Sequence, residues 1–172
     1  MSSKKELDSI LLKIHLNLKG EPCYDITLDK IYSNKNSNYS YQNCITIAKA
    51  YLKGNTLIRN VDKHFKWLKK GKKLMYSAKK VDDELFLLLA KYHYHYDKEL
   101  FKNLERCKKY CLKIVNNHEA LYYLGCISLI DQMKYNLKDR NFENSLNYFQ
   151  ISADMGNKDA KYQVDLVSTM VN

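Results

Sequence analysis

Four stretches of this chain carry the same apolar pattern, and the intervals between them limit what the chain can fold into. When the stretches are aligned, Ile47, Leu89, Leu124 and Val164 fall at equivalent positions, 42, 35 and 40 residues apart. Repeats of about 34 to 47 residues are typical of units made of two helices. Such a unit cannot bury its apolar face alone, and neighbouring units cover one another by stacking. The spacing therefore predicts an all-α fold of antiparallel helical hairpins, about three and a half in number.

The local sequence sets the expected ends of these helices. Apolar periodicity predicts first helices over 42–53, 83–96, 118–131 and 158–171, and second helices over 61–79, 98–115 and 141–155. The acids at 82–83 and the asparagines at 116–117 stand where side chains cap the free N–H groups of a helix start. Gly156 followed by Asn157 indicates the end of one helix and the start of the next. One proline and five glycines also favour helices over an all-β fold.

The segment before the repeats is expected to form a helical cap. Apolar residues three and four apart predict a helix over 4–19, a short helix is expected after Asp25 or Thr27, and 33–43 is interpreted as a polar loop. We interpret the first helix as amphipathic rather than as a signal peptide, because it lacks a continuous apolar segment. No run approaches the length of about 18 apolar residues that spans a membrane. The predicted organisation is a cap over 1–41 and a repeat region over 42–172, together one compact domain.

Several short motifs resemble a known family. Tyr51 and Gly54 in AYLKG, Trp67 in FKWLKK, and Gly156 to Ala160 in GNKDA look like Sel-one-like repeats, a branch of the tetratricopeptide-like helical hairpins. The resemblance covers roughly 42–172 and is poorest in the second unit, whose second helix lacks the alanine pair and the glycine. It implies a right-handed α-solenoid that holds other proteins, commonly as an adaptor, and it implies no catalytic residue.

A second apolar stripe runs along the back of the first helices. At about 100° per residue, Leu87 and Tyr94 lie opposite Leu89, which faces the second helix. The equivalent residues of the three full repeats make the stripe Ile45, Leu52, Leu87, Tyr94, Tyr122 and Leu129. It has two interpretations: packing against neighbouring repeats, or a concave groove open to a partner, with Tyr94 and Leu129 as the strongest candidates.

The second helix of the first unit is strongly basic. Residues 63–80 contain eight lysines. Its predicted inward residues are Phe65, Leu68, Gly71, Met75 and Ala78, and its predicted outward residues are Lys66, Lys69, Lys70 and Lys73. This face is either a solvated helix back or a dock for an acidic protein, anionic lipid or RNA. The net charge of +10 fits an acidic partner, but only three of 29 basic residues are arginines, which disfavours base-specific reading.

No chemistry-bearing motif is predicted. Cys107 and Cys111 are four apart and His118 follows them, but the two cysteines share an apolar stripe with leucines and are expected to be small buried residues. His93 and His95 are about 200° apart on a helix, so they cannot share a metal ion. We therefore expect no catalytic residue, no metal and no cofactor.

The sequence thus predicts a non-catalytic scaffold or adaptor that binds another, possibly acidic, protein. The alternative is a basic module that binds RNA or another acidic surface through the helix over 61–79. The chain is expected to be a monomer or a weak homo-oligomer. The expected compartment is the cytoplasm, of a host cell if the chain is viral or is secreted by an intracellular bacterium.

Overall fold

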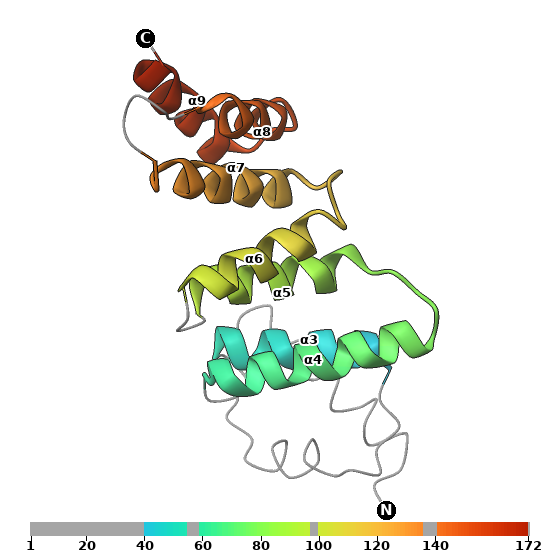
Figure 1. The fold of residues 1–172 in the computed structure, drawn as a ribbon. Helices are drawn as coiled ribbons and strands as arrows, with labels where there is room; N and C mark the ends of the chain where they lie inside the picture. The colour runs from blue at the N-terminus through green and yellow to red at the C-terminus, as the bar shows by residue number, and fades with distance from the viewer. Residues whose placement is uncertain (1–39, 55–58, 97–99, 136–140, 172) are drawn as a thin grey trace, which may run out of the picture. The chain divides into compact units, whose positions relative to one another are not determined.

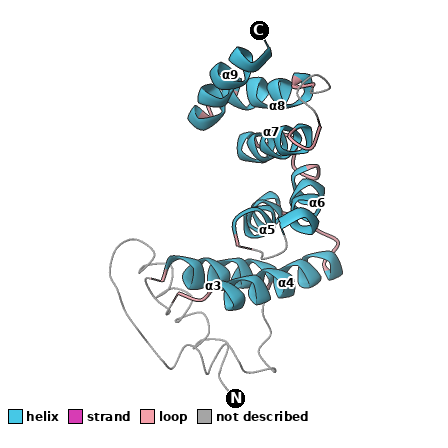
Figure 2. Ribbon diagram, turned by 60° about the vertical axis from the view of Figure 1, so that its left-hand side comes forward, coloured by secondary structure: helices cyan, strands magenta, loops and turns pink. Residues whose placement is uncertain are grey.

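The fold is all-helical throughout the described part of the chain. The computed structural model describes residues 40–54, 59–96, 100–135 and 141–171, and these ranges contain seven helices and no strand (Figure 1 and Figure 2). The helices are α3 (Tyr41–Lys53), α4 (Val61–Ser77), α5 (Asp83–His95), α6 (Leu100–Cys111), α7 (His118–Gln132), α8 (Glu143–Asp154) and α9 (Lys158–Val171). The expected all-α fold is confirmed. The predicted helix over 4–19, the short helix after it and most of the loop over 33–43 lie outside the described residues.

Side-chain caps set most helix starts, as predicted. The oxygen Oδ1 of Asp82 accepts a hydrogen bond from the Leu85 N–H at 2.9 Å, and Asn117 accepts from the Glu119 and Ala120 N–H groups. Asn157 caps α9 in the same way. Ser40 caps the N–H of Asn43, so α3 begins at Tyr41, beside the predicted start at 42 and within the end of the predicted loop over 33–43.

The helix predicted over 98–115 ends earlier than expected. In the structure α6 ends at Cys111, and the chain continues in tight turns in which the Ile114 N–H donates to the Cys111 carbonyl. These turns bury Ile114, which is 3% exposed, and bring Asn117 to the position that caps α7. A shorter helix therefore still places the apolar residue that the pattern assigned to the core.

The described residues divide into two compact units, and the division falls between Leu85 and Phe86, inside α5. In the first unit α3 and α4 lie side by side as a hairpin (Figure 1). Gly71 allows their close approach, since a Cβ atom there would stand 3.1 Å from Cβ of Cys44.

The inward face of α4 differs from the prediction in four residues: two expected residues are not buried, and two others are. Buried as predicted are Leu68, Gly71 and Met75. Phe65 is only half-buried, and Ala78 is exposed because the helix ends at Ser77. The rest of the face is His64 and Trp67, which are 1% and 8% exposed. His64 is stable there because its Nδ1–H donates to the Ala48 carbonyl of α3 at 2.8 Å.

In the second unit α7 lies among four other helices. A Cβ atom on Gly125 would stand 2.6 Å from the ring of Phe149, so the glycine brings α7 tightly against α8. Phe149, Ala160 and Val167 form a fully buried cluster that joins α8 to α9. On α5, the predicted inward residues Leu89 and His93 are buried.

Candidate interaction surfaces

The basic face of α4 carries three exposed lysines. Lys66, Lys69 and Lys73 are exposed, and Lys70 beside them is partly buried. Two of these lysines lie over aromatic rings of their own helix: Nζ of Lys69 is 4.6 Å from the centre of the Phe65 ring, and Nζ of Lys70 is 4.6 Å from that of Trp67. The predicted outward face is therefore present, with Lys70 at its inner edge.

The environment of Lys70 differs from that of the other three lysines. Burial lowers its pKa, the nearby Cys44 opposes that effect, and the positive charge of Lys66 lowers the pKa further. Burial also raises the pKa of the Cys44 thiol to about 11, so this cysteine is neutral at physiological pH. Lys66, Lys69 and Lys73 thus present the most accessible charge for an anionic surface.

The predicted apolar stripe is largely a packing surface. Ile45 is only 4% exposed, which corrects its assignment as a partner-binding residue: it has almost no surface to offer. Tyr122 and Leu129 pack against the buried cluster of α8 and α9. The Tyr94 ring lies 4.9 Å from that of Tyr123 on α7. Tyr94, Tyr122 and Leu129 are half-buried, as are Leu52 and Leu87. The role of these five residues in binding a partner stays a prediction.

Two phenols of this stripe lie near a thiol of the second unit. Cys126 contributes, after burial, to the raised pKa values of both Tyr94 and Tyr122. Burial raises the pKa of Tyr122 to about 12, and burial likewise raises that of Tyr94. Both phenols are therefore neutral at physiological pH, which suits contact between helices.

The cysteines and histidines that invited a chemical interpretation lie in packed surroundings. Cys107 and Cys111 are fully buried with their sulfur atoms 3.9 Å apart, and the pKa of Cys107 is raised by its hydrogen bond with Cys111 and by burial. His93 is buried and stacks on Tyr110, whereas the exposed His95 has Nε2 2.9 Å from the Tyr123 hydroxyl. Among the described residues, no group of three or more His, Cys, Asp or Glu side chains could hold a metal ion.

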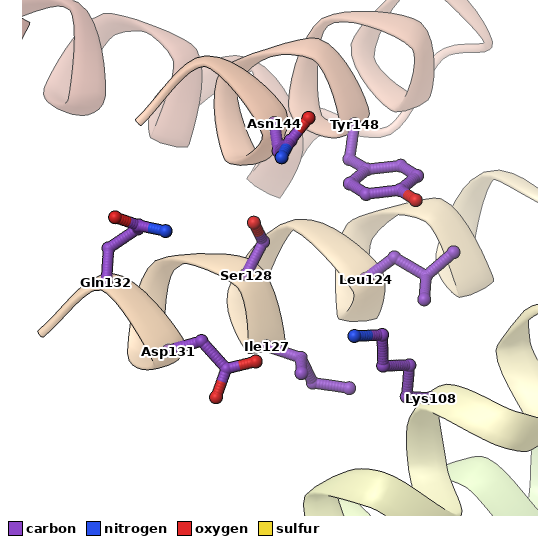
Figure 3. Close-up of a pocket in the computed structure, with 8 residues that line it drawn as sticks. All are labelled: Lys108, Leu124, Ile127, Ser128, Asp131, Gln132, Asn144 and Tyr148. Atoms are coloured by element: carbon purple, nitrogen blue, oxygen red, sulfur yellow. The ribbon is translucent and has the colours of Figure 1, made fainter. Parts of the chain in front are cut away.

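A cavity that the sequence did not suggest lies where α6, α7 and α8 meet. Its volume is about 280 Å³ (Figure 3). Six polar residues line it: Lys108, Ser128, Asp131, Gln132, Asn144 and Tyr148. The apolar lining is Leu124 and Ile127, which are 2% and 1% exposed. The only sequence signal is the spacing of Ser128 and Gln132, which places both on one side of α7.

Comparisons with known proteins found no relative of this chain. No protein-family model, no curated protein and no solved structure matches the chain. The resemblance to Sel-one-like repeats therefore stays a prediction that rests on the residues quoted above. Across the described ranges, none of the helices combines the length and the apolar character that a membrane span requires.

Proposed function

We propose that this chain is a non-catalytic interaction module, built from stacked helical hairpins of the Sel-one-like kind, that holds another protein. The expected solenoid of about three and a half repeats is part of this proposal. The described helices follow the order that the repeat spacing predicts, although α6 is shorter than the helix expected over 98–115.

The observation that carries the proposal is the packing of α7 on both of its sides. Tyr123 contacts Tyr94 of α5, and α7 also contacts α6. On the other side Gly125 receives Phe149 of α8, while Leu129 packs on the cluster that includes residues of α9. The first helix of a hairpin inside a stack contacts its own partner helix and both helices of the previous hairpin, and also the next hairpin.

The surroundings of the nucleophilic groups support a non-catalytic role. Activated cysteine nucleophiles have lowered pKa values and access to a substrate. The pKa values of Cys44, Cys107 and Cys126 are all raised, with burial as the largest or second-largest cause. These thiols suit core packing better than reaction.

The basic face of α4 favours an acidic partner. Exposed Lys66, Lys69 and Lys73 project from one side of a helix in a chain of net charge +10. Opposite charge accelerates encounter and sets orientation more than it adds affinity. The same observation favours the second candidate function, binding of RNA or another polyanion, because phosphate contacts also need exposed cations.

An affinity purification with nuclease separates these two functions. The tagged chain is incubated with lysate of its native host, with and without nuclease, beside the variant K66E/K69E/K73E. A matched control, K109E/K158E/K161E, changes three exposed lysines elsewhere and shifts net charge equally. We expect specific proteins to be retained after nuclease, to be lost with the α4 variant and to remain with the control.

The captured protein, once purified, is then titrated directly at increasing salt. A protein interface with a packed centre should lose affinity moderately with salt, whereas polyanion binding should fall steeply. Retention of nucleic acid alone, with no protein after nuclease, would support the second candidate function and contradict the first.

A further inference from the structure

The cavity between α6, α7 and α8 is lined largely by polar side chains. Lys108, Ser128, Asn144 and Tyr148 line it, and within the described residues none of their side chains makes a hydrogen bond or an ion pair. Figure 3 shows that they come from three helices, with Lys108 on α6, Ser128 on α7, and Asn144 and Tyr148 on α8. Polar side chains at a concave site that lack internal partners are available to a ligand.

The hydrogen-bonding groups of the cavity are mainly donors. Gln132 uses its Oε1 to accept the Asn141 N–H at 2.8 Å, which leaves its NH₂ group for the cavity. Lys108 adds an ammonium group that only donates. Asp131 is the one carboxylate in the lining, and it is already paired with Lys134 outside the lining at 2.7 Å. The lining carries one cation and one anion, Lys108 and Asp131; because Asp131 is already paired with Lys134, Lys108 is the charge that favours an anionic ligand.

The size of the cavity limits the class of ligand further. About 280 Å³ lies just below the range of roughly 300 to 1,000 Å³ that is typical of drug-sized ligands and cofactors. Leu124 and Ile127 line the cavity but are 2% and 1% exposed, so they offer a ligand almost no contact surface. A volume of this size suits one or two side chains of a peptide, with polar contact around them.

We propose that this cavity binds an acidic side chain carried on an extended segment of a partner protein. Lys108 pairs with the carboxylate of that side chain. The carboxamides of Gln132 and Asn144 bond the peptide groups beside it, because a carboxamide matches the donor and acceptor pattern of a peptide group. This inference deepens the proposed function, on which it rests, by assigning a site and a partner chemistry.

The test uses blocked tripeptides and the full, isotope-labelled chain. Acetyl-Leu-Glu-Leu-amide is titrated and the amide resonances of Ser128, Gln132 and Asn144 are followed by NMR. Its isostere with Gln at the centre is titrated in parallel. We expect saturable shifts at these resonances with the Glu peptide, and binding about fivefold weaker with the Gln peptide, which is the value of a partly exposed ion pair.

Matched variants separate the two halves of the site. Lys108→Met should abolish the difference between the Glu and Gln peptides, whereas Lys109→Met, an exposed neighbour outside the cavity, should preserve it. Asn144→Ala should weaken both peptides equally, because it bonds the peptide group and not the carboxylate. If the Lys108→Met chain still binds the Glu peptide more tightly than the Gln peptide, the proposal is wrong.

Two further probes address other anions. The peptide acetyl-Leu-Leu with a free terminal carboxylate and inorganic phosphate should each bind more weakly than the Glu peptide. Preference for either one would overturn the assignment to an internal acidic side chain. Because these titrations use the purified chain alone, their failure leaves the affinity purification intact, so a wrong site and a wrong function give different results.

Discussion

At the scale of single residues, Gly125 is the tightest point of the second unit. Gly125→Ala would place a methyl group 2.6 Å from the fully buried Phe149 ring. Overpacking costs about 1 to 3 kcal/mol, and the helix propensity of alanine returns at most about 1 kcal/mol. We expect a net loss of about 1 to 2 kcal/mol in the free energy of unfolding, measured by urea denaturation.

The control for that substitution lies one turn away. Ser128→Ala, on the same helix and half-buried, should change stability by no more than about 0.5 kcal/mol. Phe149→Leu in the Gly125→Ala background should recover part of the loss, because it removes the ring that the methyl group meets. A Gly125→Ala chain as stable as the natural one would contradict the close approach of α7 and α8.

His64 makes stability depend on pH. Burial lowers its pKa below 6.5, and its hydrogen bond to Ala48 opposes that effect. The unfolded chain therefore binds the proton more readily, so the stability from neutral His64 is present above about pH 6.5 and is lost as pH falls through and below that value. We expect Tm to fall between pH 7 and pH 5. The free energy of unfolding should fall by at most about 1.4 kcal/mol per pH unit, which is the limit for one proton.

The substitution His64→Gln tests the source of that slope. Glutamine keeps an N–H donor for the Ala48 carbonyl but does not titrate. The dependence of Tm on pH should therefore flatten in the variant. His95, whose pKa burial also lowers, contributes less because it is exposed. An unchanged slope in His64→Gln would place the titrating group elsewhere.

At the scale of elements, α4 combines a buried side with a charged one. Trp67 is 8% exposed on the side that faces α3. Trp67→Ala should lower stability by about 3 to 5 kcal/mol, the cost of truncating a buried aromatic residue. Trp67 is the only tryptophan, so far-UV circular dichroism during thermal melting is the suitable measurement. An unchanged melt would contradict the placement of this helix.

Substitutions on the charged side of α4 should have little effect on stability, in contrast to Trp67→Ala. Because Lys66, Lys69 and Lys73 are exposed and belong to no core, K66E/K69E/K73E should fold, with a Tm within a few degrees of the natural chain. Comparison with K109E/K158E/K161E in the same melting experiment controls for the change in net charge. Unfolding of the α4 variant alone would show that this side is not free of packing.

The helices illustrate what sequence can and cannot predict here. Caps such as Asn117 act on N–H groups two or three residues away, so local sequence predicted where most helices begin. The predicted inward face of α4 was partly wrong, because hydropathy favours burying Phe65 over His64. In the structure His64 is buried, and its hydrogen bond to the Ala48 carbonyl of α3 makes that burial possible. The cavity lined by Lys108 and Asn144 could not be predicted, since it exists only where three helices meet.

At the scale of the whole molecule, the repeat pattern of the sequence is consistent with the packing of α7 on both of its sides. A helix that is apolar on two sides is stable in a stack because hairpins on both sides cover it. That arrangement uses most of the stripe through Tyr94 and Leu129 for folding. Under the proposed function, the charged face of α4 and the cavity lined by α6, α7 and α8 are the surfaces that a partner binds.

The central claim is that successive hairpins pack on one another through α7, and aromatic NOEs test it most directly. In a NOESY spectrum of the full chain, the ring protons of Tyr123 should show cross-peaks to Tyr94, whose ring centre is 4.9 Å away. The ring of Tyr122 should show cross-peaks to Phe149 at 5.8 Å in the same spectrum. Both sets together are the predicted result. Tyr122–Phe149 cross-peaks without any between Tyr94 and Tyr123 would contradict the account, because α7 would then pack within its own hairpin alone.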